Sequence, residues 1–206
     1  MSDSADDARS PDVVWHEEGV PRAERWKAAG LSGATVWLTG LSGSGKSTIA
    51  GALTRALVAA GRITYTLDGD NLRHGLNGDL GFSAEDRAEN VRRVAHVARL
   101  LADAGVVTVV PLISPFRAGR DQARRMHEEA GLVFLEVFVD APLEVCEDRD
   151  PKGLYAKARA GELKGFTGID DPYEPPEHPD LVIAADQESP DAAAARIVGR
   201  LGSSSE

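Results

Sequence analysis

The sequence has 206 residues, of which 23 are lysine or arginine and 33 are aspartate or glutamate, so its formal net charge is −10. This length predicts one domain, or one domain with a tail. The charge argues against nucleic-acid binding, which requires a cationic surface, and no apolar run approaches the ~20 residues that cross a membrane. Small anionic substrates stay compatible with this composition, because they depend on local arginines rather than on total charge.

The two ends of the chain are polar and differ from the middle. Residues 1–30 begin with an acidic stretch unlike a secretory signal peptide, and they predict a flexible tail with a short helical appendage near residues 21–26. Residues 203–206 predict a disordered end, which leaves residues 31–202 as the folded domain. The single cysteine, Cys146, lies in a largely apolar stretch and predicts a packed thiol in a cytoplasmic protein.

Apolar runs alternate with helical patterns through the predicted domain. The predicted strands are Thr35–Thr39, Ile63–Leu67, Val106–Leu112, Val133–Val139 and Leu181–Ala184. The predicted helices are Lys46–Ala60, Ala84–Ala104, Arg117–Ala130, Leu143–Arg149 and Ala192–Leu201. This alternation is typical of an α/β fold in which helices cover both faces of a mostly parallel sheet. Such sheets bind ligands beyond the carboxyl ends of their strands.

The first predicted strand is followed by GLSGSGKST, which matches the P-loop pattern G-x-x-x-x-G-K-[ST] between a strand and a helix. Glycines let the backbone N–H groups point at phosphate oxygens, while Lys46 would reach the β- and γ-phosphates and Ser47 would ligate Mg²⁺. The stretch therefore predicts a nucleoside triphosphate site. Its residues are Gly40, Leu41, Ser42, Gly43, Ser44, Gly45, Lys46, Ser47 and Thr48.

Charged residues follow the second predicted strand. Asp68 or Asp70 would orient Mg²⁺ through water or accept the proton of an attacking hydroxyl, and a solvated Asp-Gly turn is the alternative. Arg87 and Asn90 lie three residues apart on one helix face, and Arg73 precedes them. Paired hydrogen bonds from guanidinium groups suit an anionic substrate, whereas a salt-bridged helix surface is the alternative.

Two later segments also fall at the predicted binding edge. Ser114, after the third strand, is a nucleophile, a substrate contact or a helix cap, and the absence of a neighbouring histidine in the sequence favours the last two. Residues 148–168 are rich in basic side chains and end in Gly-Phe-Thr-Gly. They predict a mobile basic lid that would expel water from the transferring phosphoryl group, with a solvated surface helix as the alternative.

Taken together, these segments resemble the adenylylsulfate kinase (APS kinase) family over residues 13–185. The matching strings are VVWHEEGV, GLSGSGKST, DGDNLRHGLNGDLGFSAEDRAEN, ISPFR and FVDAPLEVCEDRDPKGLYAKARAGELKGFTGIDDPYEPP. The P-loop string is found in many families. The string that begins DGDNLRHGLN and the KGFTGIDDPYE part of the last string are specific to this family. Phe116 stands where the family commonly has tyrosine.

The resemblance implies a P-loop kinase that transfers phosphate from ATP, with Mg²⁺, to the 3′-hydroxyl of adenosine 5′-phosphosulfate (APS) in sulfate assimilation. Phe82 and Phe166 would enclose the adenine of APS, and Ser114 matches a serine often described as a phosphoserine intermediate. The implied substrate contacts are Asp68, Asp70, Arg73, Phe82, Arg87, Asn90, Ile113, Ser114, Lys152, Lys164, Phe166 and Thr167, with Arg149 on the ATP side. The resemblance also implies a cytoplasmic homodimer and functional coupling to ATP sulfurylase.

Three other functions remain open from the sequence. A nucleoside or sugar kinase of the same fold would differ only in its acceptor. A GTP-dependent switch generally needs an N-K-x-D string, and none occurs here. A catalytically inactive ATP-binding protein would have lost Lys46, Ser47 or Asp70, and all three are present. Pro115, Phe116 and Arg117 include no base at neutral pH, so the sequence predicts direct phosphoryl transfer without a Ser114 intermediate.

Overall fold

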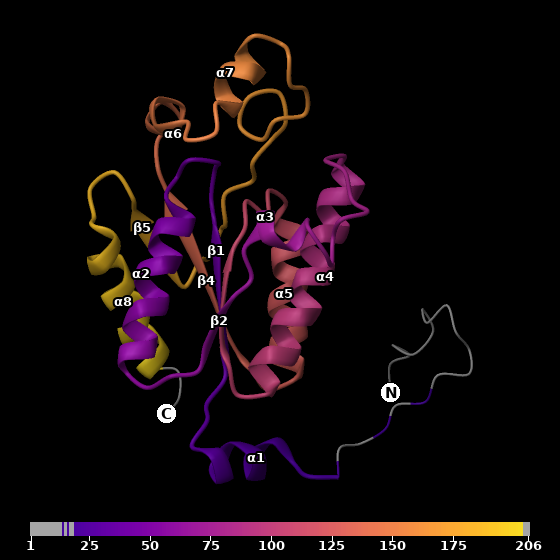
Figure 1. Ribbon diagram of the computed structural model, residues 1–206, viewed down its shortest axis with the longest axis vertical. Helices are drawn as coiled ribbons and strands as arrows, with labels where there is room; N and C mark the ends of the chain where they lie inside the picture. Colours follow the sequence, from indigo (N-terminus) through magenta and orange to yellow (C-terminus); the bar gives the residue numbers. More distant parts are fainter. Residues whose placement is uncertain (1–13, 15, 17–18, 204–206) are drawn as a thin grey trace.

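The computed structural model describes residues 14, 16 and 19–203, and a five-stranded sheet forms its centre (Figure 1). The strands are β1 (Ala34–Thr39), β2 (Thr64–Thr66), β3 (Val107–Pro111), β4 (Val133–Asp140) and β5 (Leu181–Ala184). They lie in the order β2-β3-β1-β4-β5, and each neighbouring pair is parallel. Parallel pairing requires helical crossovers, as the alternating sequence pattern predicts.

Helices cover both faces of this sheet, which confirms the predicted three-layer α/β fold (Figure 1). One layer contains α2 (Lys46–Ala59) and α8 (Pro190–Ser203), and the other contains α4 (Ala84–Asp103) and α5 (Arg117–Glu129). All residues of β1 and β3 are buried, because they lie between the two helical layers. An apolar cluster packs each helical layer against the sheet. One cluster includes Leu53 and Ile197, and the other includes Trp37 and Val94.

The order of the strands determines where along the sheet a ligand can bind. The chain leaves the central strand β1 for β2 beyond β3, and it later crosses back from β3 to β4 on the other side of β1. The loops after β1 and β3 therefore diverge, and such a switch point leaves a crevice at the carboxyl ends of the strands. The P-loop and Ser114 follow these two strands.

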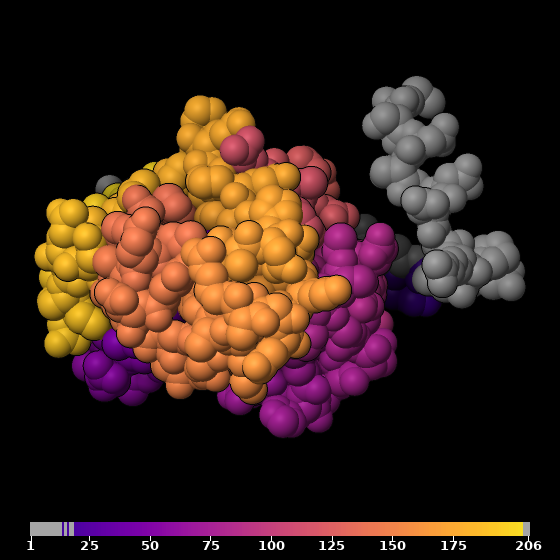
Figure 2. Space-filling view, turned by 90° about the horizontal axis from the view of Figure 1, so that it is seen from above, coloured from indigo at the N-terminus to yellow at the C-terminus, as the bar shows by residue number. Residues whose placement is uncertain are grey.

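A separate layer lies over this edge of the sheet. It contains α6 (Leu143–Arg149), α7 (Leu154–Arg159) and the loop that follows, and Figure 2 shows these orange segments spread across the top between α8 and the start of α4. This layer has its own apolar cluster, which includes Cys146, Tyr155 and Phe166. Cys146 is fully buried, as its sequence context predicts.

Some element boundaries differ from the sequence predictions. The appendage is a longer helix, α1 (Arg22–Ala29), while α3 (Gly69–Leu72) and α7 were not predicted because four to six residues give too little periodicity. Helix α8 begins before the predicted Ala192 and continues through Ser203, beyond the predicted domain end. The predicted tail at residues 1–13 lies outside the described residues. No helix within residues 19–203 is long and apolar enough to span a membrane.

Candidate active site

A cavity of about 680 Å³ opens at the carboxyl edge of the sheet, beneath the layer formed by α6 and α7. Its walls come from the P-loop, the segment from α3 to the first half of α4, the end of β3, residues 149–167 and the loop after β5. Most of the predicted site residues border it. Within the described residues, Gly40, Leu41 and Ser44 of the predicted set do not line the cavity and instead support the P-loop around it.

Two glycines of the P-loop are required by close backbone contacts. A Cβ at Gly40 would lie 2.5 Å from the carbonyl oxygen of Val139, and one at Gly43 would lie 2.8 Å from that of Cys146. Both glycines also have positive φ angles, of +151° and +72°. The loop is therefore pressed against β4 and α6 on one side, which leaves its other side open for phosphate oxygens.

Lys46 is folded back onto its own loop. Its Nζ donates hydrogen bonds to the carbonyl oxygens of Gly40 at 2.9 Å and Leu41 at 2.6 Å. Burial lowers the pKa of Lys46 to about 8, against the smaller opposing effects of Cys146 and Asp70. The next two residues, Ser47 and Thr48, are exposed at the start of α2. The lysine thus lies at the loop that would hold a triphosphate, and a phosphate would stabilise its charged form.

Asp68 and Asp70 have different positions. Asp68 caps α3, because its Oδ1 accepts hydrogen bonds from the backbone N–H groups of Asp70 at 3.0 Å and Asn71 at 3.2 Å. The carboxylate of Asp70 is exposed, borders the cavity and pairs with Lys152. Asp68 therefore orients the turn, while Asp70 is the carboxylate that can act on a bound ligand.

Arg73 supports an exposed aromatic ring. The side chain of Phe82 is 66% exposed, and the guanidinium carbon of Arg73 lies 4.2 Å from the centre of its ring. Nη1 of Arg73 also donates to the carbonyl oxygens of Leu80 and Gly81, each at 3.0 Å. The predicted anion-binding arginine thus holds Phe82 out at the cavity wall, because a cation stacks favourably on the ring face.

Arg87 joins helix α4 to the loop after α7. Its Nε donates to the carbonyl oxygen of Phe82 at 2.9 Å, and its two other nitrogens donate to the hydroxyl of Thr167 and the carbonyl of Gly165. Asp171 completes the contacts with an ion pair at 3.4 Å. This second arginine therefore holds the two sides of the cavity together.

Asn90 is oriented by a second asparagine that the sequence did not single out. Its Oδ1 accepts a hydrogen bond from Nδ2 of Asn77 at 3.0 Å, and both side chains are buried. Because the acceptor oxygen of Asn90 is used in this way, its amide N–H groups remain to donate toward the cavity that the residue borders.

Ser114 is buried within a chain of hydrogen bonds. Its Oγ accepts from Nε1 of Trp37 at 3.0 Å and donates to Oγ1 of Thr39 at 3.0 Å, which in turn donates to the carbonyl oxygen of Ile113 at 2.7 Å. The hydroxyl of Tyr173 is 3.0 Å from Thr39. Among the described residues, no carboxylate or imidazole contacts the hydroxyl of Ser114. Its position is therefore that of a structural hydroxyl rather than of an activated nucleophile.

The covering layer contributes three more of the predicted residues. Arg149 donates to the carbonyl oxygens of Ser44 at 3.2 Å and Ala185 at 2.9 Å. Phe166 packs edge-on against Tyr155, with ring centres 4.9 Å apart, and is 8% exposed at the cavity. Lys164 is exposed at the rim, which leaves its charge available to an anionic ligand.

The sequence analysis missed several residues that border or support the cavity. Ala185, Glu188 and Pro190 follow β5, so the rule applied to the other strands would have found them. Tyr155 donates its hydroxyl to the carbonyl oxygen of Ser42 at 2.9 Å. Asp170 accepts from the backbone N–H groups of Gly165 and Phe166 and so shapes their turn. No spacing rule would have found these last two supports.

Comparisons with known proteins agree with this geometry. Residues 32–184 match the family model for adenylylsulphate kinase. A curated adenylyl-sulfate kinase from Clostridium acetobutylicum is 56% identical over 175 residues, which cover 85% of this chain and 86% of that protein. The chloroplastic adenylyl-sulfate kinase of Catharanthus roseus is 58% identical over 84% of this chain, and the match spans 55% of the length of that longer protein.

A solved structure supports the same assignment. The APS kinase of Mycobacterium tuberculosis, in complex with AMPPNP and APS, is 57% identical and superposes with a TM-score of 0.81. The match covers 84% of this chain and 99% of that one. A P-loop joined to the specific strings around Asp70 and Phe166, on a fold shared with that enzyme, leads to one conclusion: the chain belongs to the adenylylsulphate kinase family.

Proposed function

We propose that the protein transfers the γ-phosphoryl group of ATP to the 3′-hydroxyl of adenosine 5′-phosphosulfate, forming ADP and 3′-phosphoadenosine 5′-phosphosulfate. The observation that carries this proposal is a single cavity with two different sides. The P-loop borders one side, and aromatic and basic residues, including Phe82, Phe166 and Lys164, border the other. The family membership supports it, as does the relative solved with AMPPNP and APS.

The P-loop end would hold ATP. Its backbone N–H groups and the N-terminus of α2 attract phosphate oxygens, and Lys46 would exchange its two carbonyl acceptors for the β- and γ-phosphates. The carbonyl oxygens of Ser44 and Ala185 hold Arg149 at the same end. Its planar guanidinium is then suited to stack on the adenine of ATP.

The oxygen ligands at this end fit Mg²⁺. Ser47 presents an exposed hydroxyl beside Lys46, and Asp70 presents an exposed carboxylate to the same cavity. Mg²⁺ prefers hard oxygen ligands and usually binds through one or two protein groups together with water and substrate phosphates. The ion would neutralise charge on the transferring phosphoryl group when bound, while Ser47 and a water held by Asp70 would position it.

The opposite wall would hold adenosine 5′-phosphosulfate. Phe82 borders the cavity from the loop before α4, and Phe166 borders it from the loop after α7, so an adenine between them would gain about 1–3 kcal/mol from each stacked ring. Lys152 and Lys164 supply positive charge at the same wall, and Asn90 supplies amide donors. These groups suit an anionic acceptor although the whole chain carries a net charge of −10.

The chemistry that these residues support is a single displacement. The 3′-oxygen of the acceptor forms a bond to the γ-phosphorus as the bond between that phosphorus and the β–γ bridging oxygen breaks. Asp70 or its bound water accepts the hydroxyl proton, and Lys46 neutralises charge on the phosphoryl oxygens. The buried hydrogen bonds of Ser114 to Trp37 and Thr39 favour this direct route over a phosphoserine intermediate.

A coupled assay of ADP release tests the proposal. We expect release from MgATP to depend on adenosine 5′-phosphosulfate, and to be far slower with AMP, gluconate or shikimate as the acceptor. Release that is independent of an acceptor, or a clear preference for one of the other three, would reject the proposed substrate. A homodimer, coupling to ATP sulfurylase and a cytoplasmic location stay predictions from the family resemblance.

A further inference from the structure

The backbone directly after β3 has an unusual conformation. The φ angle of Ser114 is +42°, in the left-handed region where every other described residue is a glycine. This region is unfavourable for a residue with a Cβ, so contacts around Ser114 must hold it there. Ile113, Ser114 and Pro115 all border the cavity, and the groups that hold this backbone therefore also shape the cavity wall.

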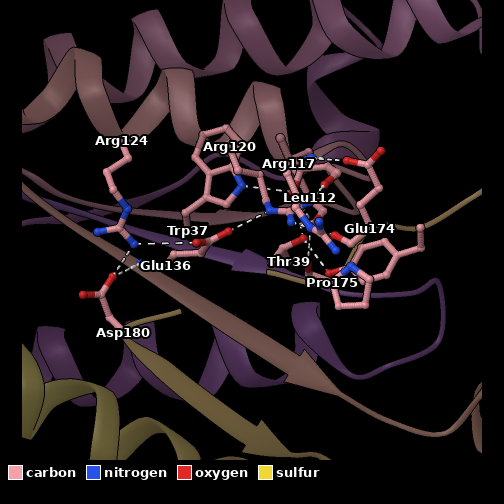
Figure 3. A network of polar contacts seen from close by, with 12 residues as sticks. Trp37, Thr39, Leu112, Arg117, Arg120, Arg124, Glu136, Glu174, Pro175 and Asp180 are labelled. Atoms are coloured by element: carbon pink, nitrogen blue, oxygen red, sulfur yellow. Dashed lines mark hydrogen bonds and ion pairs between the residues drawn. The ribbon is translucent and has the colours of Figure 1, made fainter. Parts of the chain in front are cut away.

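Arg120 is the group that holds this backbone from outside the cavity. Its side chain is 1% exposed, and its Nη1 donates to the carbonyl oxygen of Ser114 at 2.6 Å. Its Nη2 donates to the carbonyl oxygen of Glu174 at 2.7 Å, and its Nε donates to the carboxylate of Glu136 at 2.7 Å (Figure 3). A buried guanidinium needs such pairing, and here each of its three nitrogens donates to a different segment.

Glu174 belongs to the segment that returns from the covering layer to the sheet. Its backbone N–H donates to the carbonyl oxygen of Pro115 at 2.9 Å. Its carboxylate accepts from the backbone N–H of Arg117 at 2.8 Å (Figure 3). Eight residues earlier, Phe166 forms part of the opposite cavity wall. Glu174 therefore ties the chain that continues from Phe166 to the segment after β3.

Tyr173 strengthens the same attachment. The guanidinium carbon of Arg120 lies 5.8 Å from the centre of its ring, and its hydroxyl is 3.0 Å from Oγ1 of Thr39. Its ring also stacks on Phe138 of β4, with centres 6.1 Å apart. Arg120 and Tyr173 thus fasten the end of the covering segment to the wall after β3.

We propose that Arg120 is a positioning residue for the acceptor substrate. Arg120 joins the segment at Ser114 to the segment at Glu174, which continues from Phe166. It thereby sets the distance between the Ser114 side and the Phe166 side of the space for adenosine 5′-phosphosulfate. Arg120 is not among the residues that border the cavity, so it acts through these two carbonyl groups. The inference rests on the proposed function, because it assigns this wall to that acceptor.

Steady-state kinetics of Arg120→Lys test the inference. Lysine keeps a positive charge near Glu136 but cannot donate to three acceptors in a planar fork. We expect the KM for adenosine 5′-phosphosulfate to rise about tenfold, because small displacements of a binding wall weaken substrate positioning strongly. The KM for ATP should change less than about twofold, since the P-loop is held by contacts of its own.

Arg124→Lys is the matched control. Arg124 lies one turn further along α5, donates to Asp180 at 2.6 Å and is 3.6 Å from Glu136, but neither contact reaches the cavity wall. Both KM values of this variant should stay within about twofold of the wild type, even where its melting temperature falls. Tyr173→Phe, which removes only a hydroxyl, should raise the KM for the acceptor about threefold.

The outcomes separate the inference from the proposed function. An unchanged acceptor KM in Arg120→Lys, an equal rise in both KM values, or the same selective rise in Arg124→Lys would overturn the positioning role. If Arg120→Lys does not fold, the same two KM values of Arg120→Gln decide the question, because its amide keeps a donor without a buried charge. A wild-type protein that does not phosphorylate adenosine 5′-phosphosulfate would instead overturn the proposed function.

Discussion

The two ends of the cavity are built in different ways. The P-loop end comes from one stretch, residues 40–48, whose shape follows from its glycines and from the start of α2. The acceptor end comes from segments around Asp70, Phe82, Ser114 and Phe166, which are joined mainly by side chains distant in sequence. A site formed by adjacent residues can be read from a motif, whereas a distributed site depends on the contacts that hold its parts together.

The contacts of two arginines show this difference most clearly. Arg149 donates to the P-loop, but that loop is already shaped by its glycines and by their close contacts with β4 and α6. Arg87 instead joins α4 to Gly165 and Thr167 across nearly eighty residues of sequence. We therefore expect substitutions at the P-loop end to affect the chemical step or ATP binding, and substitutions at the other end to affect mainly the acceptor.

Lys46→Ala gives the largest expected effect at the P-loop end. Loss of the charge that stabilises the transferring phosphoryl group should lower kcat by about 100- to 1000-fold. The melting temperature should change little, because burial already disfavours the charged lysine. Lys27→Ala, at an exposed position on α1, serves as the control for loss of a lysine. Near-normal turnover in the Lys46 variant would contradict the P-loop assignment.

Asp70→Asn tests the carboxylate that borders the cavity between its two ends, where we propose that the chemical step takes place. We expect kcat to fall about 100-fold with little change in the KM for the acceptor, as for an interaction made in the transition state. Lys152→Ala removes the ion-pair partner of Asp70 and should change KM more than kcat. A defect confined to the acceptor KM in Asp70→Asn would give this carboxylate a binding role.

The pH dependence distinguishes Lys46 from the rest of the site. Its pKa is lowered to about 8 by burial, so the charged form is lost as the pH rises through that value in the free protein. The neutral amine no longer attracts phosphates, and kcat/KM for ATP should fall about tenfold per pH unit above pH 8. In Lys46→Arg this fall should be absent, because guanidinium stays charged. A fall that persists in Lys46→Arg would assign the ionisation to another group.

Ser114→Ala has the smallest expected effect. The variant loses hydrogen bonds with Trp37 and Thr39, which should lower the free energy of unfolding by about 1 kcal/mol. We expect turnover to stay within about fivefold of the wild type, since the backbone at Ser114 rather than its hydroxyl shapes the wall. Initial-rate kinetics should be sequential. Ping-pong kinetics, or a phosphorylated Ser114 that passes into product at the turnover rate, would contradict direct transfer.

Much of the fold was predictable because its signals are local. All five strands and the five predicted helices occur, since buried parallel strands appear as short apolar runs and surface helices show a regular apolar stripe. The family and the three-layer α/β fold are confirmed. The ends of α8 and the short helices α3 and α7 were missed, because one turn of helix is stabilised by caps such as Asp68 rather than by periodicity.

The roles of the acceptor residues were less predictable. Arg73 and Arg87 were selected for their charge, yet the first supports the ring of Phe82 and the second joins α4 to Gly165. The mobility of the covering segment stays a prediction, as do the contacts of each residue with bound substrate. Sequence spacing predicts which residues lie near the acceptor end of the cavity. The direction in which a long side chain points depends instead on its neighbours in space.

The sequence by itself determined the P-loop, because close backbone packing admits only glycine at Gly40 and Gly43, and Gly40 is a fixed position of the motif. It also determined which residues meet at the carboxyl edge of the sheet. Only the tertiary structure revealed the residues that support the acceptor end of the cavity, above all Arg120 with its acceptors at Ser114 and Glu174. The physical reason is that a buried guanidinium needs several acceptors at once, and folding alone brings such distant groups together.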